Sequence, residues 1–182
     1  IVEIQSQDIE TDEHILKEGF AFLLEAIKNG WRYKDGILEK GDGSVKFRYV
    51  SQSVFEIFNG YVYREVNVNG REVVDIGANV GDSAIYFALN GAKKVVGVEP
   101  LPSVFAKALE NIKLNHLEDK IDIINAALGS RRSSIKVPCN IGTYSSVGFS
   151  TKESDGECQV PVITLSDILG KVTDPYLLKM DC

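Results

Sequence analysis

Apolar and polar positions change their spacing near residue 73 of the chain. From there onward, short apolar runs rich in β-branched residues alternate with stretches in which apolar positions recur at helical spacing. This alternation favours an α/β fold with a parallel sheet that is covered by helices on both faces. The predicted elements are strands at 73–77, 94–98, 121–125 and 176–180 and helices at 82–90, 103–114 and 164–169.

The alternation is interrupted between residues 133 and 163. This stretch holds Ser, Thr, Gly and Pro between short β-like runs, such as 134–137 and 159–162. We expect a β-hairpin insertion here, ahead of the fourth strand of the sheet. Because the sequence ends just after that strand, we also expect the remaining C-terminal strands of the sheet to be missing from it.

The elements before residue 61 are shorter. Apolar positions at helical spacing predict one helix at 12–30, which ends at an Asn-Gly pair. Residues 31–50 predict short strands that are separated by glycine-containing turns at 34–36 and 41–43.

A short helix is predicted at 52–59, followed by a strand or extended segment at 61–63. We therefore divide the chain into two parts. Residues 1–60 form an N-terminal helix and short β extension that packs on the core, and residues 61–182 form the core domain.

A glycine-rich turn joins the first strand of the core domain to its first helix. Glycine lets the backbone approach a ligand closely, and the start of a helix offers unpaired N–H groups. The spacing is Gly-x-Asn-x-Gly, unlike the Gly-x-Gly-x-x-Gly of dinucleotide-binding enzymes. Asp75 precedes the turn; it is expected to repel a pyrophosphate and to pair with an ammonium group. The turn therefore favours a nucleoside that carries an amino acid, with candidate ligand-binding residues Asp75, Gly77, Ala78, Asn79, Gly81 and Ser83.

Two further strand ends supply candidate ligand contacts. Glu99, followed by Pro100, ends the second strand at the edge that faces the ligand crevice in parallel α/β sheets. A carboxylate there can accept two hydrogen bonds from a ribose diol. Ala126 follows the third strand among small residues that would let an adenine ring lie against the backbone; a tight turn that only packs is an equally good interpretation.

Asp181 ends the fourth strand, which is expected beside the first strand, across the topological switch point. It is the candidate catalytic residue, because it could remove or orient the proton of an attacking hydroxyl. A helix N-cap is the alternative. Tyr63, Ser145 and Ser146 are candidate substrate contacts, against the simpler interpretations of packing for the tyrosine and a polar loop for the serines.

Composition excludes several classes of function. The 182 residues carry a net charge of −6, and Lys and Arg occur in runs of two at most, which argues against nucleic acid as a partner. Neither a membrane span nor a signal peptide is visible, so we expect a cytoplasmic protein without a membrane partner. The three cysteines lack Cys-x-x-Cys spacing and are predicted to be unconnected thiols in a reducing compartment. The two histidines are isolated, so no metal site is expected.

These motifs together resemble the class I S-adenosylmethionine-dependent methyltransferases, and more closely the FkbM-type family. The resemblance covers roughly residues 61–182 and rests on segments 73–83, 91–102, 111–115, 125–129 and 178–181. It implies a Rossmann-like sheet of seven strands, with the amino acid part of S-adenosyl-L-methionine near Asp75, Gly77, Asn79 and Gly81, and the ribose at Glu99. It also implies methyl transfer by in-line displacement, to a hydroxyl oxygen of a small metabolite, sugar or lipid.

Three alternatives stay open at this stage. A nicotinamide-dependent oxidoreductase would also use Glu99 for its ribose, although Asn79 and Asp75 argue against it. An RNA methyltransferase is disfavoured by the acidic balance. A module that binds the cofactor without catalysis is compatible with an incomplete sheet. The sequence alone gives neither the methyl acceptor nor the oligomeric state.

Overall fold

The computed structural model describes residues 26–60, 62–140 and 157–181. The chain divides into two compact units, Ile1–Arg48 and Tyr49–Cys182. The predicted boundary after residue 60 therefore lies inside the second unit, and the predicted packing of 1–60 on the core stays a prediction.

The first unit contains an antiparallel sheet of three strands, β1 (Trp31–Lys34), β2 (Ile37–Lys40) and β3 (Lys46–Phe47). The predicted turn between the first two strands is confirmed: Asp35 and Gly36 both have positive φ, as the type I′ turn of a two-residue hairpin requires. Buried Trp31 and Phe47 pack with ring centroids 6.4 Å apart. Of the helix predicted at 12–30, residues 26–28 are helical and the turn at 29–30 follows; residues 12–25 lie outside the described residues.

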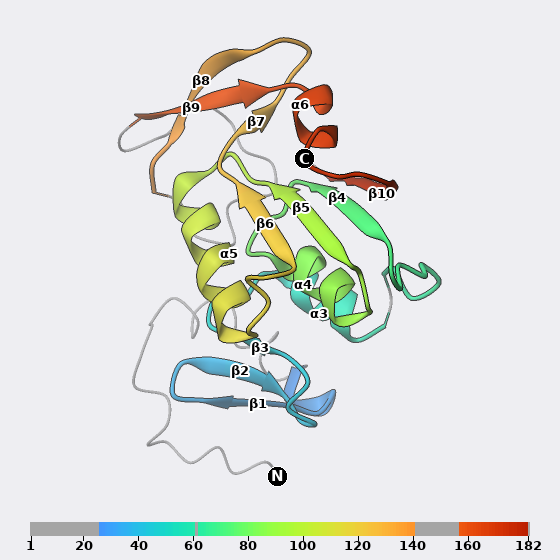
Figure 1. Cartoon of the computed structure of the whole chain (residues 1–182). Coiled ribbons are helices and arrows are strands. Elements are labelled where there is room, and N and C mark those ends of the chain that lie inside the picture. The colour runs from blue at the N-terminus through green and yellow to red at the C-terminus, as the bar shows by residue number, and fades with distance from the viewer. Residues whose placement is uncertain (1–25, 61, 141–156, 182) are drawn as a thin grey trace. The chain divides into compact units, whose positions relative to one another are not determined.

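The second unit is built on a parallel sheet with strand order β10-β4-β5-β6 (Figure 1). The strands are β4 (Glu72–Ile76), β5 (Lys94–Val98), β6 (Ile121–Ile124) and β10 (Pro175–Met180). Each is predicted to within one residue. β4 and β5 are buried on both faces and appear as continuous apolar runs, whereas β10 has an apolar sequence but is mostly exposed. The fourth strand lies beside the first, as predicted.

Helices cover both faces of this sheet. They are α4 (Asp82–Leu89), α5 (Pro102–Leu114) and α6 (Leu165–Leu169), and α3 (Gln52–Phe58) packs against α4. On one face, Val74, Ile76, Val96 and Val98 form the core cluster together with Ile168 of α6. The alternate positions of β4 and β5 face the opposite way, toward α4, where Asp75 contacts Ser83. The fold is the Rossmann-like α/β arrangement that the sequence predicts.

A buried carboxylate ties the start of β10 to β4. Glu72 is 5% exposed and accepts hydrogen bonds from the backbone N–H groups of Thr173 and Asp174 and from the Thr173 hydroxyl. Lys93 adds an ion pair at 3.5 Å. These bonds hold the pKa of Glu72 down at about 2, and they fix the position of the strand that carries Lys179 and Asp181.

The predicted hairpin insertion is confirmed as β8 (Ser133–Pro138) paired antiparallel with β9 (Glu157–Ile163), with β7 (Ala127–Leu128) completing a second sheet. The prediction of three unconnected cysteines is wrong, because Cys139 and Cys158 form a disulfide. The hairpin brings the two thiols together although 19 residues separate them in sequence. The disulfide removes the cysteine-based argument for a reducing compartment, and the cytoplasmic location stays a prediction.

The segment before β4 also differs from its prediction. Instead of an extended strand, residues 62–65 form bends and a turn, and Tyr63 has a left-handed backbone with φ +61°. Its ring packs on Phe87 and Tyr86 of α4, at centroid distances of 5.0 and 6.2 Å. Aromatic packing has overridden the β propensity of this segment. Residue 61 lies outside the described part of the chain.

Among the described residues, none of the helices combines the length and the apolar character that crossing a bilayer requires.

Candidate functional site

The turn between β4 and α4 has the strained backbone that its glycines predict. Gly77 and Gly81 have φ of +79° and +84°, and Asn79 between them has φ +49°. Asn is among the non-glycine residues that adopt this conformation most readily. Gly97 on β5 leaves room for the turn, because a Cβ at that position would lie 3.1 Å from the Cβ of Ala78.

Most backbone N–H groups of this turn are already used inside the chain. Gly77 and Ala78 both donate to the Val98 carbonyl at 3.0 Å, and Gly81 donates to the Ala78 carbonyl at 2.8 Å. The Asn79 N–H donates to Glu99 Oε2 at 3.0 Å. The turn therefore does not present a row of free N–H groups to a phosphate.

Asp75 is fully buried and already has partners of its own. Its Oδ2 accepts a hydrogen bond from the Ser83 hydroxyl at 2.6 Å, and its Oδ1 lies 2.9 Å from Lys179 Nζ. Burial raises the pKa of Asp75, and the charge of Lys179 opposes that shift. The sequence predicts that Asp75 pairs with the ammonium group of a ligand; in the structure the ammonium group of Lys179 already lies against it.

Lys179 is the residue of this site that sequence reasoning missed. It lies directly opposite Asp75 in the β10–β4 register, and its Nζ also donates to the Gly77 carbonyl at 2.7 Å. Its side chain is 9% exposed. Burial lowers the pKa of Lys179, but the charge and hydrogen bond of Asp75, together with the charges of Tyr63 and Asp82, outweigh burial and raise it. The available signal is a single lysine inside an apolar run. That run predicts a buried strand, but most residues of β10 are exposed and the Lys179 side chain is the buried one.

Glu99 lies at the end of β5 with both carboxylate oxygens engaged. Oε2 accepts from Asn79, and Oε1 accepts from the Leu101 N–H at 3.0 Å. Burial raises the pKa of this carboxyl group. The Asn125 side chain donates to the carbonyls of Glu99 and Pro100 at 2.8 and 3.1 Å and so fixes the loop that carries the acid.

Ala126 is fully buried and belongs to the core cluster with Ile168. Its packing agrees with the simpler interpretation of a turn that packs. Its predicted contact with an adenine ring stays a prediction.

A second polar cluster surrounds the start of α4. Ser51 and Ser53, at the start of α3, both donate to Asp82 Oδ2. The side-chain Nδ2 of Asn79 donates to the Ser53 hydroxyl at 3.4 Å. The Asn79 Oδ1 atom is buried and has no hydrogen-bond partner among the described residues. An unpaired buried acceptor is costly, so this oxygen is a candidate contact for a ligand donor.

Asp181 follows β10, next to the turn. Its N–H donates to the Ile76 carbonyl at 3.1 Å, and its side chain is exposed. The charges of Lys179, Asp75 and Asp181 all act on the pKa of the Tyr63 phenol, which burial raises. Asp181, Tyr63 and the ion pair therefore lie at one edge of the sheet. Ser145 and Ser146 lie outside the described residues.

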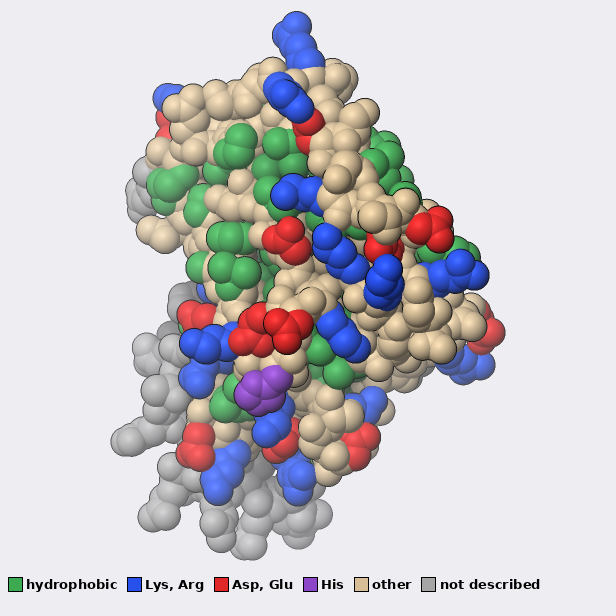
Figure 2. Space-filling view, in the orientation of Figure 1, with side chains coloured by type: hydrophobic (Ala, Val, Ile, Leu, Met, Phe, Trp, Pro, Cys, Tyr) green, Lys and Arg blue, Asp and Glu red, His purple; other side chains and the backbone are tan. Residues whose placement is uncertain are grey.

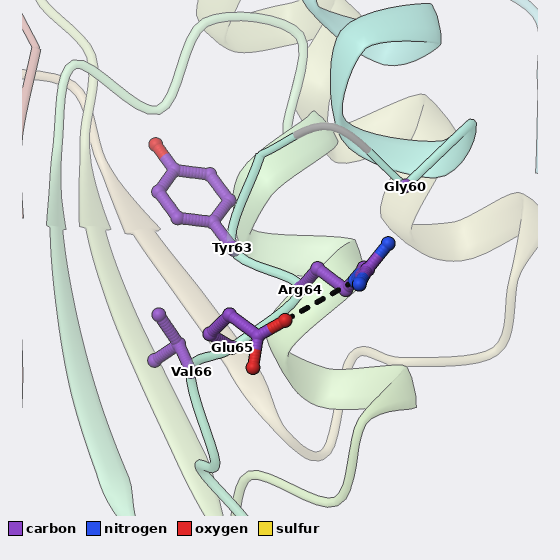
Figure 3. A pocket seen from close by; sticks show the side chains of 5 residues that line it. All are labelled: Gly60, Tyr63, Arg64, Glu65 and Val66. Carbon is purple, nitrogen blue, oxygen red and sulfur yellow. Dashed lines mark hydrogen bonds and ion pairs between the residues drawn. The ribbon is translucent and has the colours of Figure 1, made fainter.

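A cavity of about 430 Å³ lies on the segment before β4 and is lined by Gly60, Tyr63, Arg64, Glu65 and Val66 (Figure 3). The Tyr63 ring and the Arg64 side chain point away from each other, and Arg64 forms an ion pair with Glu65 at 3.2 Å. Tyr63 thus connects the cavity to the charged edge of the sheet.

The described residues contain no group of three or more His, Cys, Asp or Glu side chains that could hold a metal ion. Within the described residues, the polar groups of the site are the Asp75–Lys179 ion pair and the side chains of Glu99, Asn79 and Asp181.

Comparisons with known proteins find methyltransferases. Protein arginine N-methyltransferase 6 of Danio rerio is 35% identical over 71 residues, which are 39% of this chain and 20% of that protein. Ribosomal protein L11 methyltransferase of Carboxydothermus hydrogenoformans is 46% identical over 55 residues, 30% of this chain and 18% of that protein. The chain spans about a fifth of the length of these curated relatives.

Among solved structures, protein arginine methyltransferase 10 of Arabidopsis thaliana matches with 31% identity and a TM-score of 0.33, over 37% of this chain and 19% of that chain. The sequence model described as the methyltransferase FkbM domain matches residues 75–182, more than half of the chain. The matched segment contains Asp75, the glycine turn, Glu99, Lys179 and Asp181. The chain belongs to the FkbM methyltransferase family.

Proposed function

We propose that the protein transfers a methyl group from S-adenosyl-L-methionine to a hydroxyl oxygen of a small metabolite, sugar or lipid. The observation that carries the proposal is the buried Asn79 Oδ1, which has no hydrogen-bond partner among the described residues and lies in a turn within the segment that matches the family model. A ligand with an ammonium group would supply the missing hydrogen-bond donor.

The charges around the turn fit this cofactor. Its sulfonium and ammonium groups are cationic, and the described site presents four carboxylates, those of Asp75, Asp82, Glu99 and Asp181. Opposite charges at short range in a partly buried site attract strongly. Each Glu99 oxygen accepts one hydrogen bond in the structure, and a carboxylate oxygen can accept two. Glu99 therefore keeps capacity for a ribose diol.

A dinucleotide fits the turn less well. Its pyrophosphate needs backbone N–H groups, and those of Gly77, Ala78, Asn79 and Gly81 donate inside the chain. The buried acid Asp75 stands just ahead of the turn, and Lys179 offsets its charge. The internal N–H bonds are thus the stronger argument against a nicotinamide cofactor, and the charge argument from the sequence is the weaker one.

The residues of this chain would act by placing and deprotonating the acceptor. When bound, S-adenosyl-L-methionine supplies an electrophilic methyl group and carries its own leaving group. Asp181 is the proposed base for the acceptor hydroxyl. The cavity beside Tyr63 is the proposed acceptor site, and its Arg64 and Glu65 side chains suit a small polar acceptor. Alignment of the acceptor oxygen supplies part of the rate enhancement.

The named relatives act on proteins, namely on protein arginine and on ribosomal protein L11. Their matched segments are short, and the acceptor class does not follow from them. RNA is disfavoured, because basic and acidic side chains are interspersed on the face in Figure 2 and the net charge is −6.

Isothermal titration of the purified chain tests the cofactor. We expect S-adenosyl-L-methionine and S-adenosylhomocysteine to bind with a Kd of about micromolar order and NAD to give no heat. Binding of NAD without binding of either adenosyl ligand would overturn the proposal in favour of an oxidoreductase.

A radiolabelled methyl donor then tests the acceptor, with panels of sugars, hydroxylated metabolites, lipids, protein and RNA. Transfer to a hydroxyl group is the expected result. Transfer to protein or RNA would replace the proposed acceptor class. Binding without transfer to any panel would support the alternative of a cofactor-binding module.

A further inference from the structure

Lys179 has a donor to spare at the edge of the proposed cofactor site. A lysine ammonium has three N–H donors. Lys179 Nζ lies 2.9 Å from Asp75 Oδ1 and donates a hydrogen bond to the Gly77 carbonyl at 2.7 Å. Within the described residues no third hydrogen-bond partner is present. The side chain is 9% exposed, so an outside group can still reach it.

Lys179 does more than connect strands β10 and β4. A cross-strand pair needs only the contact to Asp75, which lies opposite in the register. Lys179 also binds the carbonyl of Gly77, the first glycine of the turn, and so places a positive charge against the segment that the cofactor motif supplies. Burying a lysine is costly, and two partners satisfy only part of its hydrogen-bonding capacity.

Lys179 is also the cation shared by the acidic groups of the site. Its charge acts on Asp75, on Glu99 and on the Tyr63 phenol. The cofactor brings two cationic groups and one carboxylate to this place. The carboxylate needs a positive partner, and the unpartnered Asn79 Oδ1 can receive the ammonium group.

We infer that Lys179 binds the carboxylate of the amino acid part of the methyl donor, while it keeps its contact with Asp75. This inference rests on the proposed function. It changes the expected orientation of the ligand: its carboxylate faces β10, and its ammonium group faces Asn79.

The test compares Lys179→Met with Lys94→Met by isothermal titration. Lys94 begins β5, is half-buried and donates to the Lys171 carbonyl at 2.6 Å, so its substitution controls for the loss of a hydrogen-bonded strand lysine. Each protein is titrated with S-adenosyl-L-methionine and with its decarboxylated form, which lacks only the carboxylate.

We expect Lys179→Met to weaken S-adenosyl-L-methionine binding by about tenfold or more and to change binding of the decarboxylated ligand by less than about twofold. Lys94→Met should bind both ligands as the wild type does. Retained binding of the decarboxylated ligand also shows that Lys179→Met is folded.

Equal losses for both ligands would show that Lys179 only supports Asp75 and the turn, and would overturn the inference. Unchanged binding of both ligands would also overturn it. If Lys179→Met does not fold, Lys179→Arg takes its place, because arginine keeps the positive charge. Lys179→Arg should then prefer S-adenosyl-L-methionine over its decarboxylated form to the same extent as the wild type does. If the wild type binds neither ligand, the proposed function itself fails.

Discussion

The Glu99 carboxylate accepts the backbone N–H of Asn79 at 3.0 Å, so the acid that ends β5 holds the turn that follows β4. Its other oxygen accepts from Leu101. One side chain therefore fixes two loops and keeps lone pairs for a ligand. The structure joins the two halves of the cofactor motif through this acid.

Glu99→Gln should weaken S-adenosylhomocysteine binding by about tenfold or more. The amide group must turn a donor toward either Asn79 or Leu101, both of which donate, so one bond is lost. Titration with S-adenosylhomocysteine and its 2′,3′-dideoxy analogue separates the ribose contact from loop support. The wild type should prefer the parent ligand, and the variant should hardly distinguish the two. The exposed Glu118→Gln is the control. Full discrimination by Glu99→Gln would contradict the ribose contact.

Gly77→Val should abolish cofactor binding, because a β-branched residue rarely adopts φ +79° and the turn would have to change its backbone conformation. Gly70→Val is the matched control: its φ is +69°, and a Cβ there meets nothing within 4 Å. The strain of a left-handed backbone should cost both variants about 1–2 kcal/mol of folding free energy. Both should therefore show a similar fall in Tm. Only Gly77→Val should lose affinity in titration. An equal loss in Gly70→Val would mean that strain alone, transmitted from afar, removes binding.

Glu72→Gln should lower Tm at neutral pH. The folded pKa of Glu72 is about 2, below its ordinary value of 4.5, because the N–H groups of Thr173 and Asp174 donate to the carboxylate. A depressed folded pKa stabilises the protein above the unfolded pKa, and this contribution disappears as pH falls from 4.5 toward about 2. Thermal melts should therefore show a difference in Tm between the wild type and Glu72→Gln that becomes smaller as pH falls through that interval. A gap that is constant with pH would rule out the ionised carboxylate as its cause.

Cys139→Ser should lower the free energy of unfolding by about 2–4 kcal/mol, since a crosslink across a separation of 19 residues restricts the unfolded chain. Cys182→Ser, which leaves the disulfide intact, is the control. Urea unfolding measures both variants, and peptide mapping without reductant should find Cys139 joined to Cys158. A map in which Cys182 is joined to either residue would contradict the structure.

The elements of the second unit could be predicted because each depends on local patterns. The apolar runs of β4 and β5 and the turn at Gly77 and Gly81 are visible within a few residues of sequence. The contacts that complete the site are not local. Lys179 meets Asp75 only through the register of β10 on β4, and Glu72 meets Thr173 across 101 residues.

The errors have the same origin. A hairpin was predicted at 133–163, but its register, which brings Cys139 to Cys158, depends on pairing that spacing alone does not fix. Tyr63 has β propensity, and its packing on Phe87 decides its backbone instead. The candidate ligand contacts stay predictions, which the binding titrations test.

Asp181→Asn should separate binding from catalysis. The side chain is exposed at the end of β10, where only the backbone N–H is bound, so the substitution removes a base without removing a structural contact. With the acceptor that the panels identify, kcat should fall by about 100-fold, a typical contribution of a general base. The Kd of S-adenosyl-L-methionine should stay within about twofold. Asp174→Asn, at the exposed opposite end of the same strand, should keep full activity. An unchanged kcat would leave Asp181 with a structural role.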